Sequence, residues 1–376
     1  MKYMTVIYVL LSFFVYIIFC SVTYMIVTDI IEDKFNKKTN ELTHSFGKEV
    51  LKQLSAVKLN NSVSKMDLDY IKEKLNKNEY VKVFNDVIIK FNENEENHLV
   101  TREYMIYFEE IILLKIKKVE RKDDTIKSYM VFVLGEYRIS NYEISEFLIR
   151  SLKTKSMYLR VASLKTVAKI GNLNTLLNAI KYLSKEDKYI HNKVFVDILS
   201  QFSGDKVLLN TSFMECFDEL KEDFQKVIVE NYTKNKVTYV KDQMLRLLKD
   251  SNTKKETKIS IIRYFGSIKS QFAKDEMIKL LNKGEWEYRV VCAYALKNYK
   301  DEETTNALIE SISDKNWHVR YNSATTLLKF NESYIISKVL EKNDKYSRDI
   351  LFYVMFDNNE ISYEEYLEKS RKVEVV

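Results

Sequence analysis

The chain has 376 residues, with 60 Lys and Arg against 54 Asp and Glu, so its net charge of +6 is small for its length. An apolar fraction of 46%, including 26 Tyr and 20 Phe, supplies an extended core or two domains and excludes a disordered or collagen-like chain. Six Gly and no Pro argue against an all-β sandwich or a glycine-rich nucleotide fold, and they permit long uninterrupted helices.

The segment 4–27 at the amino terminus contains no charged residue. As a helix, its 24 positions would rise about 36 Å, which is enough to cross a bilayer with some tilt. The apolar run is longer than the about 7–15 residues of a signal-peptide core. Cys20 follows Ile18 and Phe19, whereas lipoprotein processing needs a small residue before the cysteine. We therefore expect residues 1–28 to form a single-pass transmembrane anchor in a cell membrane.

Residues 29–64 are polar, with an apolar stripe spaced for one face of a helix, and they predict a polar helical stalk that leaves the membrane. The stripe consists of Phe35, Leu42, Phe46, Val50 and Leu54. Basic residues flank the span unevenly, with Lys2 before it and Lys34, Lys37 and Lys38 after it, which favours a cytoplasmic body. Two distant cysteines without a CxxC motif, Cys216 and Cys292, agree with a reducing compartment.

A basic residue recurs every 31 to 33 positions along most of the remaining chain. Each one opens an apolar helical segment, which is followed by a polar break and a second apolar helix. A single hairpin of this kind cannot cover its own apolar face, so successive hairpins must stack. The fold class predicted is all-α: an α-solenoid of about eight or more hairpins over residues 65–376, clearest over 120–356, preceded by one transmembrane helix. The recurring residues are Lys127, Arg160, Lys193, Lys226, Lys258, Arg289 and Arg320.

The sequence DKNWHVRYNSATTL, from Asp314 to Leu327, resembles the short bacterial form of the HEAT repeat. Trp286 and Trp317, like Arg289 and Arg320, recur 31 positions apart. The resemblance implies a HEAT-like solenoid beside envelope-assembly or glycosyltransferase machinery. Some short bacterial HEAT units belong to bilin lyase-like proteins that attach or detach a tetrapyrrole, so the resemblance leaves that enzymatic alternative open.

The recurring residues of the repeat are expected to be structural. Asp314 precedes Arg320 by six positions, as Asp187 precedes Lys193, which predicts a ladder of carboxylates and cations between successive loops. We expect the aromatic pair to wedge adjacent hairpins from core positions. The residues to which this structural role is assigned are Arg160, Arg289, Arg320, Asp314, Trp286 and Trp317.

The sequence offers little for catalysis. Its four histidines, His44, His98, His191 and His318, lack metal-ligand spacing, and the repeated His-Glu pairs of the HEAT-type di-iron hydroxylase are missing. Walker A, GxGxxG and GxSxG motifs are also missing. We therefore expect a non-enzymatic protein with no catalytic residue, cofactor or metal.

Positive charge is concentrated in residues 234–283, which hold 13 basic and five acidic residues. One reading is a solvated face. The other is a cationic groove for a protein partner or an anionic lipid surface, with nucleic acid disfavoured. Second helices line the inner face of most HEAT superhelices, and they would carry the groove residues Lys241, Arg246, Lys249, Lys274 and Lys279. The resulting hypothesis is a membrane-anchored scaffold or adaptor that binds a protein partner.

Overall fold

The computed structural model describes residues 2–188 and 190–371, and these form 21 α-helices, three short 3-10 helices and no strand. The chain divides into two compact units, one up to Asn172 and one from Leu173. The helices of the first unit are α1 (Lys2–Lys58), α2 (Lys65–Lys74), α3 (Asn78–Phe91), η1 (Glu95–Asn97), α4 (His98–Ile106), α5 (Glu109–Val119), α6 (Asp124–Tyr137), α7 (Tyr142–Leu152) and α8 (Met157–Ile170).

The second unit is a series of helical hairpins in which a first helix and a second helix alternate. The elements are α9 (Leu173–Lys185), α10 (Asn192–Ser200), α11 (Lys206–Glu215), η2 (Phe217–Glu219), α12 (Glu222–Lys234), α13 (Lys241–Lys249), α14 (Lys255–Ser267), α15 (Gln271–Lys283), α16 (Trp286–Ala295), η3 (Leu296–Asn298), α17 (Glu302–Ser311), α18 (Trp317–Phe330), α19 (Ser333–Glu341), α20 (Lys345–Asp357) and α21 (Tyr363–Arg371).

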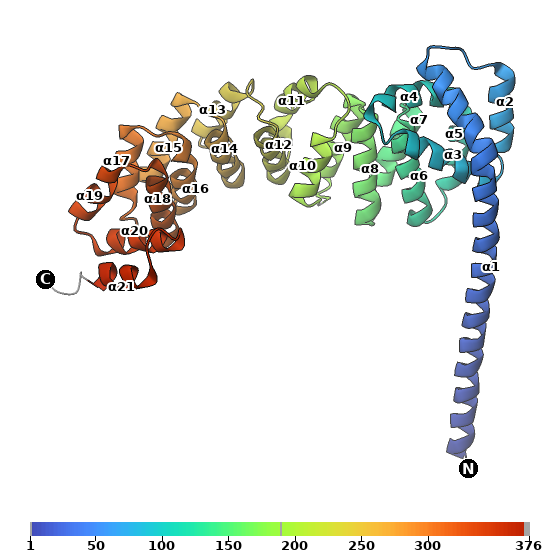
Figure 1. Cartoon of the computed structure of the whole chain (residues 1–376), viewed down its shortest axis with the longest axis horizontal. Coiled ribbons are helices and arrows are strands. Elements are labelled where there is room, and N and C mark those ends of the chain that lie inside the picture. Colours follow the sequence, from blue (N-terminus) through green and yellow to red (C-terminus); the bar gives the residue numbers. More distant parts are fainter. Residues whose placement is uncertain (1, 189, 372–376) are drawn as a thin grey trace. The chain divides into compact units, whose positions relative to one another are not determined.

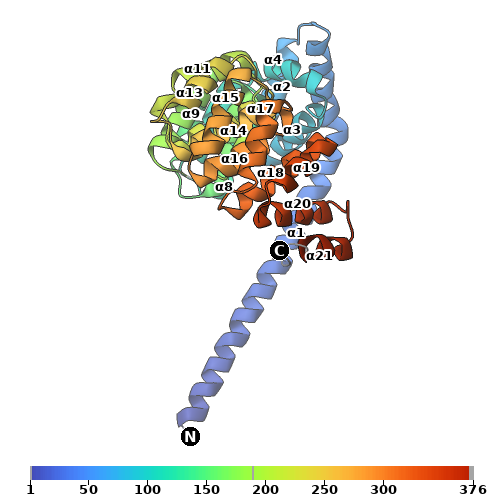
Figure 2. The same ribbon diagram turned by 90° about the vertical axis from the view of Figure 1, so that its left-hand side faces the viewer.

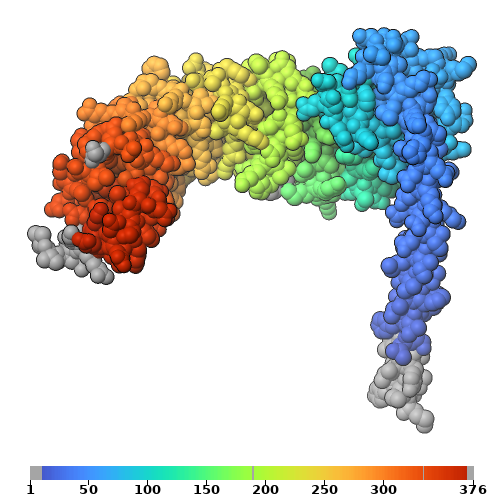
Figure 3. Space-filling view, in the orientation of Figure 1, coloured from blue at the N-terminus to red at the C-terminus, as the bar shows by residue number. Residues whose placement is uncertain are grey.

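Helix α1 is one continuous helix that joins the predicted anchor to the predicted stalk. Every side chain from Leu11 to Val27 is exposed, and Figure 3 shows this part of α1 standing clear of the other elements of its unit. The predicted stalk ends in the core, because Phe46, Val50 and Leu54 are buried where α1 packs along α3 and α4. Their spacing of four residues forms a stripe that must be covered, so the carboxyl-terminal part of this segment belongs to the folded unit.

Helix ends in this proline-free chain are set by side-chain caps and left-handed residues. Asp123, Asp301 and Asn316 accept backbone N–H bonds at the starts of α6, α17 and α18. Asn331, with φ of 51°, ends α18, and Gly171, with φ of 79°, ends α8. Most of the other non-glycine residues with positive φ in the described segments are Asn or Asp, which take this conformation more readily than other side chains.

Stacking of the first helices follows one register in both units. The tenth residue of α18, Thr326, donates its hydroxyl hydrogen to the carbonyl of Ala293, the eighth residue of α16, at 2.8 Å. In the first unit, Thr166 and Val131 occupy the same positions of α8 and α6 and are also 2.8 Å apart. The repeated hydrogen bond shows that the hairpins share a packing register as well as a sequence period.

Within the second unit the hairpins form two layers. The first helices α12, α14, α16, α18 and α20 pack on one another in chain order, and α13, α15, α17 and α19 form the other layer. Both layers can be followed in Figure 1 and again in the turned view of Figure 2. This unit bends, and in Figure 1 the layer from α13 to α19 lies on the outside of the bend. The first helices therefore line its inner side.

Candidate functional site

The recurring cation sits at the fourth residue of α8, α16 and α18, where it binds the loop that precedes its own helix. Arg160 donates from Nη1 to the carbonyls of Thr154 and Lys155 at 3.0 and 3.1 Å. Arg320 makes the equivalent bonds to Asp314 and Lys315, at 2.8 and 3.1 Å. In both cases the guanidinium satisfies carbonyls that no helix can pair, so these side chains are occupied within the repeat.

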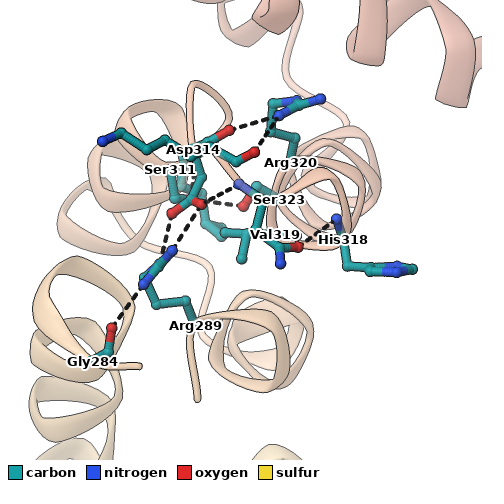
Figure 4. A network of polar contacts seen from close by, with 11 residues as sticks. Gly284, Arg289, Ser311, Asp314, His318, Val319, Arg320 and Ser323 are labelled. Carbon is teal, nitrogen blue, oxygen red and sulfur yellow. Dashed lines mark hydrogen bonds and ion pairs between the residues drawn. The ribbon is translucent and has the colours of Figure 1, made fainter. Parts of the chain in front are cut away.

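Asp314 links two successive hairpins. Its carboxylate accepts two bonds from Arg289 of the preceding hairpin, from Nε at 2.7 Å and from Nη2 at 3.0 Å. Figure 4 shows this fork beside the Arg320 contacts. Burial opposes ionisation of Asp314, but the Arg289 hydrogen bonds, the Asn316 N–H and the nearby positive charge together lower its pKa. In the ladder of carboxylates and cations, Asp187 pairs with Lys221 at 3.3 Å.

The two tryptophans are not core residues. Trp286 and Trp317 are the first residues of α16 and α18, and they are 48% and 44% exposed. Trp317 stacks on Tyr321 with ring centroids 5.1 Å apart, and its edge faces Tyr353 at 6.2 Å. The expectation of buried wedges is wrong because the first residue of each helix lies at the end of its hairpin, where about half of each side chain stays exposed.

The predicted cationic residues lie on α13 and α15, in the outer layer of the second unit. Arg246, Lys249 and Lys279 are exposed, and Lys241 is half-buried. The expectation that they face the inside of the curve is wrong for this unit, since its inner side is lined by first helices. Lys279 is also 3.3 Å from Glu276 on its own helix.

Lys274 is not available to any partner. Its side chain is 4% exposed, and its Nζ lies 2.9 Å from Asp301 and 2.7 Å from Glu303. Burial disfavours its charge, yet the hydrogen bonds to Glu303 and Asp301 leave its pKa raised. Both acids come from the next hairpin, so Lys274 joins two repeats, and its assignment to a binding groove is withdrawn.

A hollow of about 470 Å³ opens among the first helices of the second unit. It draws residues from α12, α14, α16, η3 and α18, and so it crosses four successive repeats. Its apolar part is formed by Val290, Val291 and Ala295, and its polar part includes Arg263 and Lys297. We name it the inner hollow. Its volume is within the range of about 300–1,000 Å³ that ligand pockets occupy.

The electrostatics of the inner hollow are positive. No carboxylate is among the residues that line it. Lys297 places its Nζ 3.8 Å from the ring centroid of Tyr294, and Lys329 approaches the same ring at 5.8 Å. A hydrogen bond from Lys297, reinforced by the positive charges of Lys297 and Lys329, lowers the pKa of Tyr294. Anionic groups would therefore be favoured here.

The hollow between α15, α17 and α19 is different. Its volume is about 650 Å³, but Glu303, Glu310 and Glu341 share its lining with Lys338 and Lys342. Lys342 is already paired with Glu310 at 2.8 Å. Charges of both signs in this lining give no preference for one sign of ligand, which leaves the inner hollow as the candidate site of the second unit.

Sequence reasoning missed the inner hollow because its residues do not share one repeat position. One signal does point to it, the row formed by the ninth residues of the first helices, although in α12 this residue is Glu230. This row contains Arg263 of α14 and Tyr294 of α16, and it continues through Thr325 of α18 and Tyr353 of α20. If the hairpins are aligned on the cation at the fourth residue of the first helix, Arg263 and Tyr294 fall at the same position.

Among residues 2–188 and 190–371, no three His, Cys, Asp or Glu side chains gather in a cluster that could hold a metal ion. Cys216 and Cys292 are buried free thiols, and burial raises the pKa of both, which opposes formation of a reactive thiolate. Cys20 is exposed on α1.

The family described as HEAT repeats matches residues 275–346, which run from α15 into α20. No curated protein matches the sequence. Among solved structures, human deoxyhypusine hydroxylase in complex with glycerol matches with 12% identity and a TM-score of 0.28, over 82% of this chain and 96% of that chain. The HEAT match, together with the stacked hairpins and the all-helical described residues, supports a HEAT-repeat protein with an α-solenoid fold.

Proposed function

We propose that this protein is a single-pass, membrane-anchored HEAT-like scaffold that holds a protein partner at the cytoplasmic face of a membrane. The proposal assigns it no reaction. It places the scaffold beside envelope-assembly or glycosyltransferase machinery, as the HEAT resemblance suggests.

The observation that carries the proposal is the exposed first half of α1. An 18-residue window of this helix has a mean hydropathy of 2.1, and none of it is buried against the rest of the chain. In water, 17 successive uncovered residues from Leu11 to Val27 would be unfavourable, because burying apolar surface yields about 25 cal/mol per Å². A bilayer would cover them and would accept a helix whose backbone bonds are all internal.

The spacing along α1 suits an anchor. Thr39 is the first buried residue after the apolar run, and it lies 12 positions beyond Val27. At about 1.5 Å per residue this connector measures about 18 Å, which is longer than the headgroup layer on one side of a bilayer. The connector carries Asp, Glu and Lys side chains that suit this polar layer. The folded unit would then stand just clear of the headgroups.

Membrane flotation of the full chain, followed by an alkaline carbonate wash, tests the anchor. We expect the full chain to float and resist the wash, and a variant lacking residues 2–28 to remain soluble. A full chain that is extracted by carbonate would refute an integral anchor. Protease digestion of intact and opened cells shows on which side of the membrane the second unit lies. We expect the second unit to be protected in intact cells, and its cleavage there would show the opposite orientation.

Proximity labelling from the carboxyl terminus tests the scaffold role. The matched control is the same fusion on the chain lacking residues 2–28. A partner at the membrane should be labelled by the anchored chain and lost in the control. If the two fusions label the same proteins, the membrane placement has no role in partner selection.

A further inference from the structure

We propose that the inner hollow is the recognition site for an acidic segment of a protein partner, bound by its carboxylates against Arg263 and Lys297. This inference rests on the proposed function and names the chemistry of the partner. Three observations carry it: cations without an ion pair, an apolar floor beside them, and the position of the hollow across several repeats.

In the described segments, carboxylates hold several other cations of this unit but none of the cations of the hollow. Lys226, Lys234, Lys255, Lys274, Arg289 and Lys300 of the same unit each lie within 3.3 Å of a carboxylate. Within the part of the chain that the structure describes, no ion pair involves Arg263, Lys297 or Lys329. Local acids therefore neutralise several cations of this unit and leave those of the hollow without a counter-ion. An anion that reached the hollow would meet cations with no competing carboxylate, although Lys297 also contacts the ring of Tyr294.

The groups in the hollow match a carboxylate attached to carbon chains. An arginine fork binds a carboxylate through two parallel bonds, and Arg263 is exposed with its donors free for this. Val290, Val291 and Ala295 offer an apolar floor next to the charge. The methylene groups of a glutamate or a neighbouring leucine would cover that floor, while inorganic phosphate would leave it wet.

The extent of the hollow favours a peptide segment. Its lining comes from Thr233 on α12, Arg263 on α14, Tyr294 on α16 and Asn322 on α18, so a bound chain would cross successive first helices. Nucleic acid is disfavoured because the first helices also present acids, including Glu230 and Asp357, which interrupt any continuous basic path.

Fluorescence anisotropy with defined peptides tests the inference on the full chain in phosphatidylcholine nanodiscs. The probe is a fluorescein-labelled, end-capped octapeptide of alternating glutamate and leucine. Control peptides carry glutamine or lysine in place of each glutamate. We expect the acidic peptide to bind at least tenfold more tightly than the glutamine peptide, and to weaken as salt is raised.

Two double variants locate the binding. Arg263→Gln with Lys297→Gln removes the hollow cations and should weaken the acidic peptide about tenfold or more. Lys249→Gln with Lys269→Gln removes the same charge from exposed positions outside the hollow, and it should change binding less than twofold. Equal losses in both variants would show that net charge alone is sensed and would overturn the site.

A charge swap keeps the test decisive if removal of the cations disturbs folding. Arg263→Glu with Lys297→Glu should lose the acidic peptide and gain the lysine peptide. The unlabelled acidic peptide should compete with the labelled probe. If it does not, while inorganic phosphate or phosphatidylglycerol vesicles do, the hollow is a phosphate site and the peptide proposal is overturned. Membrane flotation is measured in a separate experiment. A chain that binds the acidic peptide but does not float with membranes would refute the anchor and leave the peptide site in place.

Discussion

At the scale of single residues, the recurring arginine acts as a clamp on its own loop. Arg320 pairs two carbonyls of the loop before α18, and Arg160 does the same before α8. A hydrogen bond to a charged group contributes about 1.5–3 kcal/mol where its loss leaves a buried acceptor unsatisfied, and less at an exposed acceptor such as the Lys315 carbonyl. Arginine is suited to this position because one planar group reaches both acceptors.

Substituting Arg320 by alanine should lower the free energy of unfolding by about 1–3 kcal/mol, since the Asp314 and Lys315 carbonyls lose their donor. Urea denaturation followed by circular dichroism measures this. Arg348 is the matched control, because it is also the fourth residue of its helix and its side chain makes no hydrogen bond or ion pair with the described residues. Arg348→Ala should therefore cost much less. A similar loss in both would contradict the clamp.

Asp314 makes stability depend on acid pH. Its pKa is lowered in the folded protein, while in the unfolded chain it should be near 3.9. Above about pH 5 both states are ionised and the full contribution is present. As the pH falls through 4 and below, the unfolded state takes up its proton first, so the contribution is lost.

Asp314→Asn should therefore cost about 1.5–3 kcal/mol at pH 7 and much less near pH 3. Urea titrations of the wild type and the variant at four or five pH values would give this difference directly. The wild type should lose stability more steeply with acid than the variant does. A difference that stays constant with pH would show that the Arg289 fork does not depend on the carboxylate charge.

At the scale of elements, first helices approach closely where their contact residues are small. A Cβ added at Gly266 of α14 would lie 3.0 Å from the Cβ of Ala295 and 3.1 Å from its Cα. Gly135, at the twelfth position of α6 like Gly266 in α14, comes as close to Thr166. Gly266 and Ala295 lie in the first-helix layer, on the inner side of the bend of the second unit.

Gly266→Ala should destabilise the protein by about 1 kcal/mol or more, because strain against the Ala295 backbone exceeds the gain in helix propensity. Gly47 provides the control: an added Cβ there would meet Val87 at 3.4 Å, which is ordinary contact. Gly47→Ala should thus be neutral or stabilising by up to about 1 kcal/mol. Thermal denaturation of both variants compares them, and equal melting temperatures would refute the packing argument.

Much of this element pattern could be predicted from the sequence. The spacing of Arg160, Arg289 and Arg320 gives the period, since each of them is the fourth residue of its helix. The inner layer could not be predicted, because it depends on contacts between residues about 29 positions apart, such as Gly266 and Ala295. Lys274 shows the same limit: its burial depends on acids supplied by the next repeat.

At the scale of the whole molecule, α1 combines two environments in one helix. Its first part is exposed and apolar from Leu11 to Val27, while its last part supplies Phe46, Val50 and Leu54 to the core of the first unit. Uniform exposure suits a lipid environment, and a one-sided stripe suits packing on α3 and α4. The boundary between these two patterns separates the residues that stabilise the first unit from those that would insert into the membrane.

Truncation at two points on α1 should separate these roles. Removing residues 2–28 takes away no buried side chain among those described from Leu11 to Thr28, so the melting temperature of the remaining chain should match that of the full chain in detergent. Removing residues 2–50 also takes Phe46 and Val50 from the core, and each buried side chain of this size costs about 2–5 kcal/mol. That loss should unfold much of the first unit, because α3 and α4 would lose the helix they pack against.

Hydrogen exchange across α3, α4 and α14 reports each region, and α14 should stay protected as a control in the second unit. Full protection of α3 in the longer truncation would show that the first unit folds without α1, and the anchor would then be joined to the protein by contacts that carry no stability.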